Sequence, residues 1–314
     1  FYDRLRQKVS AAHFAQLMPH LANDPSVMEA RRLSGDAPDA RWALYRASEQ
    51  LIDLGLQVSA GSNNWAVSGK HSTSGKPLLA NDMHLGYSLP GIWYQIHQVV
   101  EGSDGESDTL DVIGLAVPGQ PLVVTGHNRH IAWGMTNVMV DDMDFYEEKL
   151  DEKGERYWRD GYWHELIQRT ETFKVKDGAP QTRIIRKTAN GPLIGKFHKL
   201  PKRAISMQWS GFFESNEAGA LFRVNRARNW KQFTNGMRGF RAVSQNVVFA
   251  DVEGNIGMLC AAGIPVRARG DGSSLAPGWR SDYAWQGFVP FEEQPVSFNP
   301  PSGRLSSANN RTTG

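Results

Sequence analysis

Short runs of β-branched and aromatic residues fill the chain from residue 62 onward, separated by glycine, proline, asparagine and aspartate. Runs of this length and composition predict strands. Two stretches with helical spacing, residues 217–226 and 230–240, interrupt them, and Asn229 is placed to cap the second. Strands with helical insertions predict an α+β layered fold. The expected strands are residues 65–68, 77–80, 93–100, 110–115, 122–125 and 131–135, a hairpin of 172–176 and 182–186 around Asp177-Gly178, and a pair formed by 246–250 and 256–261.

Residues 1–61 have a different pattern. The apolar residues Leu44, Ala47, Leu51 and Leu54 recur at steps of three and four, which predicts one face of a helix. We therefore expect two regions, a helical one over residues 1–61 and a sheet-rich one over residues 62–314. Because the chain opens on Phe1 rather than on methionine, we expect it to be a fragment of a longer protein.

The composition argues against several classes of protein. Basic and acidic residues are interspersed and the net charge is +2, so we expect no nucleic-acid partner. No apolar segment approaches the roughly 18 residues that a membrane-spanning helix needs, so we expect no membrane insertion. The single cysteine, Cys260, excludes an internal disulfide, and its apolar neighbours predict a buried thiol.

Ser62 lies in the stretch Gly61-Ser62-Asn63-Asn64, whose composition is typical of a loop that leads into the strand expected from Trp65. Taken alone, this stretch predicts an ordinary loop. Four blocks downstream change that interpretation, because with Ser62 they resemble the penicillin acylase family of N-terminal-nucleophile hydrolases. The blocks are Gly75-Lys76-Pro77-Leu78-Leu79-Ala80-Asn81-Asp82-Met83-His84-Leu85, Gly126-His127-Asn128, Trp133-Gly134-Met135-Thr136-Asn137 and Asp141-Asp142-Met143-Asp144.

The resemblance implies a four-layer αββα sandwich and a chain that cuts itself between Gly61 and Ser62. A serine hydroxyl is a weak nucleophile and needs a base to take its proton. A chain that begins at Ser62 carries an α-amino group whose usual pKa of about 7.7–8.0 suits that task near physiological pH. In the family, residues 1–61 would be the tail of the smaller α subunit plus any spacer, and Ser62 would begin the β subunit that binds it.

Three further residues enter the expected catalytic site through the resemblance. The backbone N–H of Asn137 and the side-chain amide of Asn309, in Ser307-Ala308-Asn309-Asn310-Arg311, would stabilise the oxyanion of an acyl-transfer intermediate. His84 would lie next to the nucleophile. By pattern alone, Asn309 is equally typical of a turn and His84 of a structural histidine. Met83 departs from the proline that many members carry before this histidine.

The resemblance leaves the substrate open. Family members deacylate penicillins, cephalosporins and N-acyl-homoserine lactones, so the expected substrate is a small N-acyl compound such as a β-lactam side-chain amide. Leu85 and Thr125 stand where penicillin G acylases have pocket phenylalanines, which argues against a slot fitted to phenylacetyl groups. An N-acyl-homoserine lactone acylase is therefore the named alternative. Asn246 matches a position near the family's site, or is a buried structural asparagine.

Asp141, Met143 and Asp144 match ligands of the family's structural calcium site, Met143 through its carbonyl oxygen. Oxygen ligands of this kind suit Ca²⁺, whereas a solvated acidic turn is the alternative interpretation. The spacing of His127 and His130 would fit zinc, but no third ligand follows at a suitable distance, so we expect no zinc site. No organic cofactor is expected.

Two other interpretations remain open from the sequence. A secreted module with exposed tryptophans, such as Trp158, Trp163, Trp279 and Trp285, would bind carbohydrate by stacking and catalyse nothing. A degenerate family member would neither process itself nor hydrolyse amides. The resemblance also implies a periplasmic or secreted protein, because most known members have that location.

Overall fold

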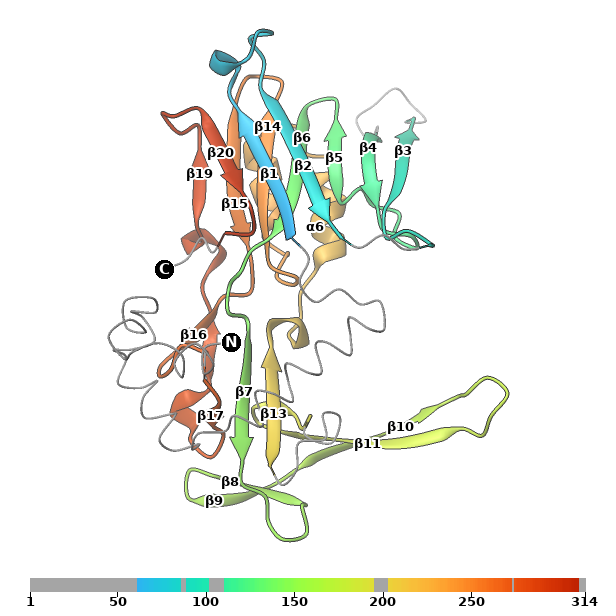
Figure 1. Cartoon of the computed structure of the whole chain (residues 1–314), viewed down its shortest axis with the longest axis vertical. Helices are drawn as coiled ribbons and strands as arrows, with labels where there is room; N and C mark the ends of the chain where they lie inside the picture. The colour runs from blue at the N-terminus through green and yellow to red at the C-terminus, as the bar shows by residue number, and fades with distance from the viewer. Residues whose placement is uncertain (1–60, 86–88, 102–109, 195–202, 273, 311–314) are drawn as a thin grey trace, which may run out of the picture. The chain divides into compact units, whose positions relative to one another are not determined.

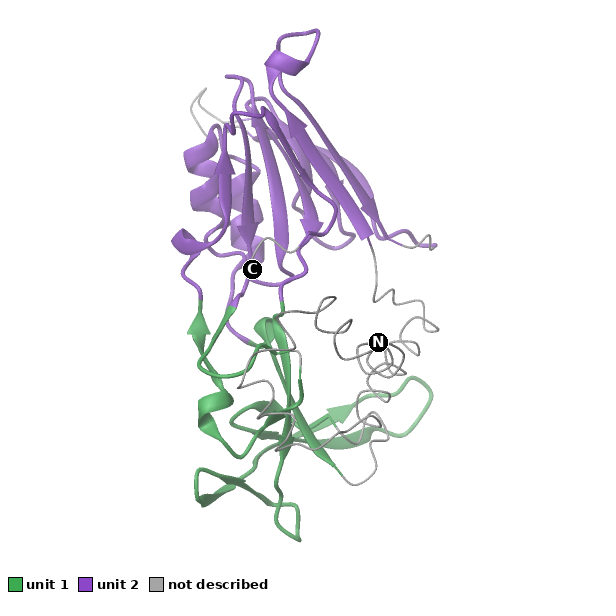
Figure 2. Ribbon diagram, turned by 60° about the vertical axis from the view of Figure 1, so that its left-hand side comes forward, with its two compact units in different colours: residues 1–50, 141–212, 265–288 green, residues 51–140, 213–264, 289–314 purple. Residues whose placement is uncertain are grey.

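The computed structural model describes residues 61–85, 89–101, 110–194, 203–272 and 274–310. They divide into two compact units (Figure 2). The larger unit draws on residues 61–140, 213–264 and 289–310, and the smaller unit on residues 141–212 and 265–288. The helices expected in residues 1–60 lie outside the described residues. Among the described residues, no helix is long and apolar enough to cross a bilayer.

A seven-stranded antiparallel sheet forms the centre of the larger unit (Figure 1). Its strand order is β19-β15-β14-β6-β5-β4-β3. The strands are β3 (Tyr94–Val100), β4 (Leu110–Ala116), β5 (Thr125–Asn128), β6 (Ile131–Asn137), β14 (Gln245–Asp251), β15 (Ile256–Ala261) and β19 (Val296–Phe298). The predicted pair of residues 246–250 and 256–261 is confirmed as β14 and β15, which lie next to each other in the middle of this sheet.

A three-stranded sheet covers one face of the seven-stranded sheet. Its order is β2 (Leu78–His84), β1 (Gly61–Val67) and β20 (Arg304–Ser307), with β1 in the middle. Side chains alternate along β1, so Ala66 faces inward and packs with Val248 and Ile256 of the larger sheet. The chain connects β1 to β2 through a short 3-10 helix, η1 (Gly69–His71).

Two helices cover the opposite face of the seven-stranded sheet. They are α6 (Glu217–Val224) and α7 (Trp230–Met237), and Asn216 and Asn229 cap them by accepting backbone hydrogen bonds. Phe233 of α7 and Phe249 of β14 are fully buried in the same core cluster. Burial of each such side chain stabilises the fold by about 1.5–3 kcal/mol. The larger unit therefore has three layers, helices, sheet and sheet (Figure 1).

One predicted strand, residues 122–125, is wrong. β5 begins only at Thr125, because the backbone of Val123 is paired with a side chain instead of a strand. The amide of Asn225 accepts from Val123 N–H at 2.9 Å and donates to its carbonyl oxygen at 2.8 Å. A single amide at the end of α6 thus replaces a strand neighbour, and apolar composition alone does not reveal such a partner.

The smaller unit is built around β7 (Met143–Glu148), which pairs with β13 (Ala204–Trp209) antiparallel and β17 (Ala276–Pro277) parallel. Glu148 of β7 is buried, and its Oε1 accepts hydrogen bonds from Thr188, Asn190 and Ser206. The other strands are β8 (Arg156–Arg159), β9 (Tyr162–Glu165), β10 (Ile167–Phe173), β11 (Gln181–Thr188), β12 (Gly191–Pro192), β16 (Pro265–Arg267) and β18 (Trp285–Phe288). The remaining 3-10 helices of the described residues are η2 (Ser210–Phe212), η3 (Ser281–Tyr283) and η4 (Phe291–Glu293).

The hairpin predicted around Asp177-Gly178 is confirmed as β10 and β11, with longer strands than the sequence indicated. Asp177 has a φ of 56°, a left-handed conformation that aspartate tolerates better than most residues. Most side chains of this ribbon are exposed, and the ribbon reaches away from β7 and β13 (Figure 1).

Candidate active site

Ser62 lies within β1, so the loop expected at residues 61–64 is wrong. Gly61, Ser62, Asn63 and Asn64 pair with residues 84 to 81 of β2. The Asn64 amide is 1% exposed and donates to the carbonyl oxygens of Gly134 and Asn246. These tertiary hydrogen bonds outweigh the turn preference of the two asparagines. The Ser62 side chain lies on the same inward face as Asn64 and is 8% exposed.

Asn309 joins Ser62 to Asn137. The backbone N–H of Ser62 donates to Asn309 Oδ1 at 2.5 Å, and Asn309 Nδ2 donates to the Asn137 carbonyl oxygen at 2.7 Å. Asn309 has a φ of 62°, which asparagine adopts more readily than most residues. The fold thus brings together three residues that the sequence analysis selected, across separations of 247 and 172 positions.

The backbone N–H of Asn137 is turned toward the same side. In an antiparallel strand, the N–H and C=O of one residue point to the same edge, and residues two apart share it. The Asn137 carbonyl accepts from Asn309, and both backbone groups of Met135 bond to Asn81 of β2. The Asn137 N–H therefore points to the edge of β6 that faces away from β14, the edge at which Asn81 and Asn309 bond this strand. The side chain of Asn137 is held by Gln245, whose Nε2 donates to Asn137 Oδ1 at 2.6 Å.

His84 lies at the end of β2, directly opposite Gly61. Its Nε2 is 2.8 Å from Asp82 Oδ2. Because a carboxylate only accepts hydrogen bonds, Nε2 carries a hydrogen. A side chain at Gly61 would come within 3.5 Å of Nδ1. The imidazole ring therefore lies beside Gly61, on the outward face of β1, whereas the Ser62 side chain lies on the inward face.

The surroundings of Ser62 are mostly neutral. Amide side chains at positions 64, 81, 246 and 309 supply most of the polar contacts in this part of the larger unit. The titratable groups of β2 nearest to Ser62 are Asp82 and His84, which flank Met83 opposite Ser62 and bond each other.

Comparison with known proteins assigns this arrangement to a family. The family model for penicillin amidase matches residues 2–314. The chain belongs to the penicillin amidase family. Among curated members it is 34% identical to "Acyl-homoserine lactone acylase QuiP" of Pseudomonas syringae, over 98% of this chain and 38% of that protein. It is 32% identical to "Penicillin acylase 2 proenzyme" of a Pseudomonas species, over 91% of this chain and 36% of that protein.

A solved penicillin amidase structure shows the same fold. It is a thermostable penicillin G acylase from Alcaligenes faecalis, with a TM-score of 0.65 and 28% identity, over 80% of this chain and 44% of that one. This likeness confirms the predicted fold class, and the described residues hold three of the four expected layers. The chain spans less than half the length of the relatives it matches.

Of the three residues selected for substrate contact, Thr125 lines a pocket of this penicillin amidase fold. A pocket of about 380 Å³ lies between the two sheets, and Thr125 lines it together with Leu79, Met83, Ile113 and Leu115. Leu85 follows β2 and is not among the lining residues of this pocket. Asn246 is fully buried, and its Nδ2 donates to Ser307 Oγ and the Asn310 carbonyl oxygen.

The residues selected for calcium lie in the smaller unit. Asp144 is 4% exposed, and both its oxygens are already in use. Arg267 donates to Oδ1 at 2.7 Å and to Oδ2 at 2.8 Å, and Trp285 Nε1 donates to Oδ2 at 2.6 Å. Arg267 also donates to the carbonyl oxygen of Asp141 at 2.7 Å, and Met143 begins β7 beside them. Burial, and then the charge of Asp144, raise the pKa of the nearby Tyr146 hydroxyl.

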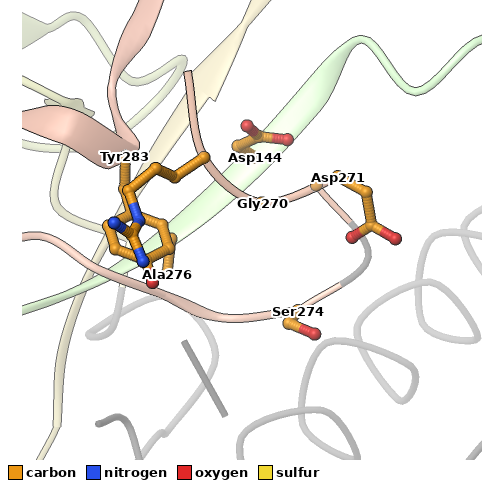
Figure 3. Close-up of a pocket in the computed structure, with 8 residues that line it drawn as sticks. Asp144, Gly270, Asp271, Ser274, Ala276 and Tyr283 are labelled. Atoms are coloured by element: carbon orange, nitrogen blue, oxygen red, sulfur yellow. The ribbon is translucent and has the colours of Figure 1, made fainter. Parts of the chain in front are cut away.

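This donor set does not by itself fit Ca²⁺. The ion takes six to eight oxygens, and here two carboxylates already share one guanidinium. Among the described residues, no group of three or more histidine, cysteine or acidic side chains is placed to hold a metal. The adjacent cavity, between Asp144, Gly270, Ser274 and Tyr283, has a volume of about 10 Å³, which suits one water molecule (Figure 3).

The four tryptophans considered for carbohydrate binding do not form a platform. Trp163 is 43% exposed on β9, whereas Trp158, Trp279 and Trp285 are half-buried. Trp158 stacks edge-to-face on Trp163 and Trp279 lies under Lys149. These contacts indicate packing within the smaller unit.

Four residues that organise the site and the Asp144 cluster were not predicted from the sequence: Asn81, Asp82, Gln245 and Arg267. Asn81 and Asp82 stand in the block that carries the family resemblance, so that block was their one available signal. Gln245 and Arg267 act across separations of 108 and 123 positions, and no local pattern marks them.

Proposed function

We propose that this chain belongs to an amide hydrolase that cuts itself between Gly61 and Ser62 and uses the freed Ser62 to deacylate a small N-acyl compound. In the first step the Ser62 hydroxyl attacks the Gly61 carbonyl carbon, the C–N bond breaks and the nitrogen takes the hydroxyl proton. Water then hydrolyses the ester and leaves Ser62 as a chain end. The observation that carries the proposal is the hydrogen-bonded series from Ser62 N–H through Asn309 to Asn137.

The same residues support the hydrolytic step. The freed amine takes the proton of its own hydroxyl while Oγ attacks the substrate carbonyl. The oxyanion that develops needs donors already in place, and the Asn137 N–H points toward this side of β6. Asn309 Oδ1, which accepts from the Ser62 nitrogen in the uncut chain, would hold the amine so that its lone pair faces the hydroxyl.

One observation favours an N-acyl-homoserine lactone acylase over a phenylacetyl amidase. The inter-sheet pocket touches Met83, which lies opposite Ser62, and its lining includes the flexible aliphatic side chains of Leu79, Ile113 and Leu115. Thr125 also lines the pocket, and its side chain has no aromatic ring. Trp133 and His127 also line the pocket, so we place the linear acyl chain along its aliphatic side, which includes Met83. The curated relatives that carry the lactone acylase name support the same choice.

Experiments on the full-length protein test both the mechanism at Ser62 and the choice of substrate. We expect the mature large chain to begin at Ser62 by mass spectrometry, and the Ser62→Ala variant to stay a single inactive chain. We expect turnover of decanoyl-homoserine lactone to exceed that of a phenylacetyl amide. Amide turnover by Ser62→Ala would contradict the mechanism, and faster phenylacetyl turnover would contradict only the substrate.

Three further expectations belong to this proposal. The α subunit released by self-cleavage is the proposed partner of the β subunit, and an exported location is proposed from the family. Calcium is proposed only with ligands from outside the described residues, because Arg267 already compensates Asp144. Cell fractionation and metal analysis of the purified full-length protein test the last two.

A further inference from the structure

The side-chain amide of one half-buried residue, Asn81, connects the strand of Ser62 to the strand of Asn137. Asn81 lies in the middle of β2, and its side chain reaches across to the seven-stranded sheet. Its Nδ2 donates to the carbonyl oxygens of Asn63 at 3.0 Å and Met135 at 2.9 Å. Its Oδ1 accepts from Met135 N–H at 2.9 Å and from Thr125 Oγ1 at 2.9 Å. Every hydrogen-bonding position of the amide is in use.

The Asn81 amide takes the place of a strand. β5 pairs with β6 only at Trp133 and Ala132, so the backbone groups of Met135 have no partner on β5. Asn81 bonds both of them, as a neighbouring strand would. Met135 and Asn137 share one edge of β6, because residues two apart point the same way. The amide therefore fixes β6 immediately before the proposed oxyanion donor, and it also fixes Asn63, which follows Ser62.

Gly134 makes room for this amide. A Cβ at position 134 would lie 2.6 Å from the Asn81 Cβ, closer than such atoms approach. The glycine in the sequence is thus required by the close passage of β2 over β6. Thr125 and Asn81 both line the inter-sheet pocket, and Thr125 donates to Asn81, so the pocket belongs to the same network.

We propose that Asn81 is a positioning residue that sets the distance between the Ser62 hydroxyl and the Asn137 N–H, and that Thr125 couples this distance to the acyl pocket. The inference rests on the proposed function of Ser62 and adds a residue to it. Asn81 does not touch the reacting atoms. A displacement of about 1 Å between a nucleophile and an oxyanion donor costs about 100-fold in rate.

The test uses the full-length protein with decanoyl-homoserine lactone. Asn81→Asp keeps the shape of the side chain and removes both donors, and Gly134→Ala pushes Asn81 without changing its chemistry. We expect kcat to fall about 100-fold in Asn81→Asp, with KM within about threefold of the wild-type value. Thr125→Val, which removes one hydrogen bond to the amide, should lower kcat about fivefold, and Thr125→Ser should restore it.

Asn225→Asp is the matched control. Asn225 is more deeply buried than Asn81 and likewise bonds both backbone groups of its partner, Val123, but neither residue is among the contacts of Ser62, Asn309 and Asn137 described above. We expect it to lower stability and leave kcat unchanged. Unchanged kcat in Asn81→Asp, a change in KM alone, or equal losses of kcat in Asn81→Asp and Asn225→Asp would each overturn the proposal.

Three further outcomes have a fixed interpretation. If Asn81→Asp fails to fold, Gly134→Ala decides in the same way, and Thr125→Val decides through kcat alone, because Thr125 also lines the pocket. If Ser62→Ala retains activity, the proposed function fails first. If Ser62→Ala is inactive and all the Asn81, Gly134 and Thr125 variants keep wild-type kcat, only the role of Asn81 fails.

Discussion

At the scale of single residues, the site depends on amides that hold one another in place. Asn309 is the clearest case, since it has one hydrogen bond to each side of the proposed reaction centre. Asn309→Ala would remove both bonds, and a misplacement of about 1 Å at a reaction centre costs about 100-fold in rate. We therefore expect Asn309→Ala to lower kcat of the full-length enzyme by about that factor, measured with the same lactone substrate.

Asn299→Ala is the control for that prediction. Asn299 also has a positive φ, 47°, and its side chain bonds Ile256 and Asn255. Alanine at either position meets the same backbone strain. A loss of kcat as large in Asn299→Ala would show that the effect of Asn309→Ala is strain and not chemistry.

The pair of His84 and Asp82 supports a second prediction. Asp82 holds the imidazole ring beside Gly61. Under the proposed function, we expect the ring to assist the water that hydrolyses the ester. We expect Asp82→Ala to slow self-cleavage at least tenfold and to accumulate the ester form. Hydroxylamine, which cleaves esters, would then release the fragment. Cleavage at the wild-type rate would contradict this role.

The sequence could identify the chemistry of single residues but not their hydrogen bonds. Ser62, Asn137 and Asn309 were found because each stands in a recognisable block. The contacts of Asn81 depend on the register of β1 with β2 and on where β5 ends, and neither follows from local composition. The same holds for Arg267, whose partner Asp144 is 123 positions away.

At the scale of secondary structure, α6 is attached to the chain before β14 by one carboxylate. Glu217 Oε1 accepts from the backbone N–H of Arg241 and Ala242, at 3.0 and 2.9 Å. Burial would raise the pKa of Glu217, but these bonds and one from Ser215 outweigh it and lower the pKa below its ordinary 4.5. A depressed pKa stabilises the folded state above the unfolded-state value and loses that contribution in acid.

Glu217→Gln tests this linkage by urea unfolding in the single-chain Ser62→Ala background. We expect it to lower the free energy of unfolding by about 1 kcal/mol at pH 7, because the side chain is partly exposed. The difference should shrink as the pH falls through the folded-state pKa of Glu217. The exposed Glu214→Gln is the control, and a difference independent of pH would rule out the linkage.

Elements with regular spacing were predictable, and elements held by side-chain amides were not. Helices α6 and α7, the pair β14 and β15, and the hairpin of β10 and β11 follow from periodicity and turn residues. Residues 61–64 and 122–125 were misassigned. In both places buried asparagines, Asn64 and Asn225, decide the backbone partners, and these partners are distant in the sequence.

At the scale of the whole molecule, the chain passes twice from the larger unit to the smaller one and back. The sequence predicted one sheet-rich region after residue 62, because composition does not change at residues 140, 213, 264 or 289. The division into two units depends on strand pairing between segments that are distant in the sequence. The β10 and β11 ribbon belongs to the smaller unit, and residues 172–180 at its tip are all exposed.

Exposed tips of this kind are the first sites of proteolysis. We expect brief trypsin treatment of the full-length protein to cut after Lys174 or Lys176, with the rest of the β subunit intact by mass spectrometry. The cut should disappear in a Lys174→Gln, Lys176→Gln double variant. First cleavage elsewhere in residues 61–310, or a protected ribbon, would contradict the prediction.

The position of β1 between β2 and β20 has a consequence for biosynthesis. β20 leaves the ribosome after every other described strand, and Asn309 cannot reach Ser62 until β20 has paired with β1. Under the proposed function, a nascent chain would therefore keep its two future subunits on one polypeptide until β20 arrives. The cut peptide bond would then be a permanent chemical record that β20 had joined β1.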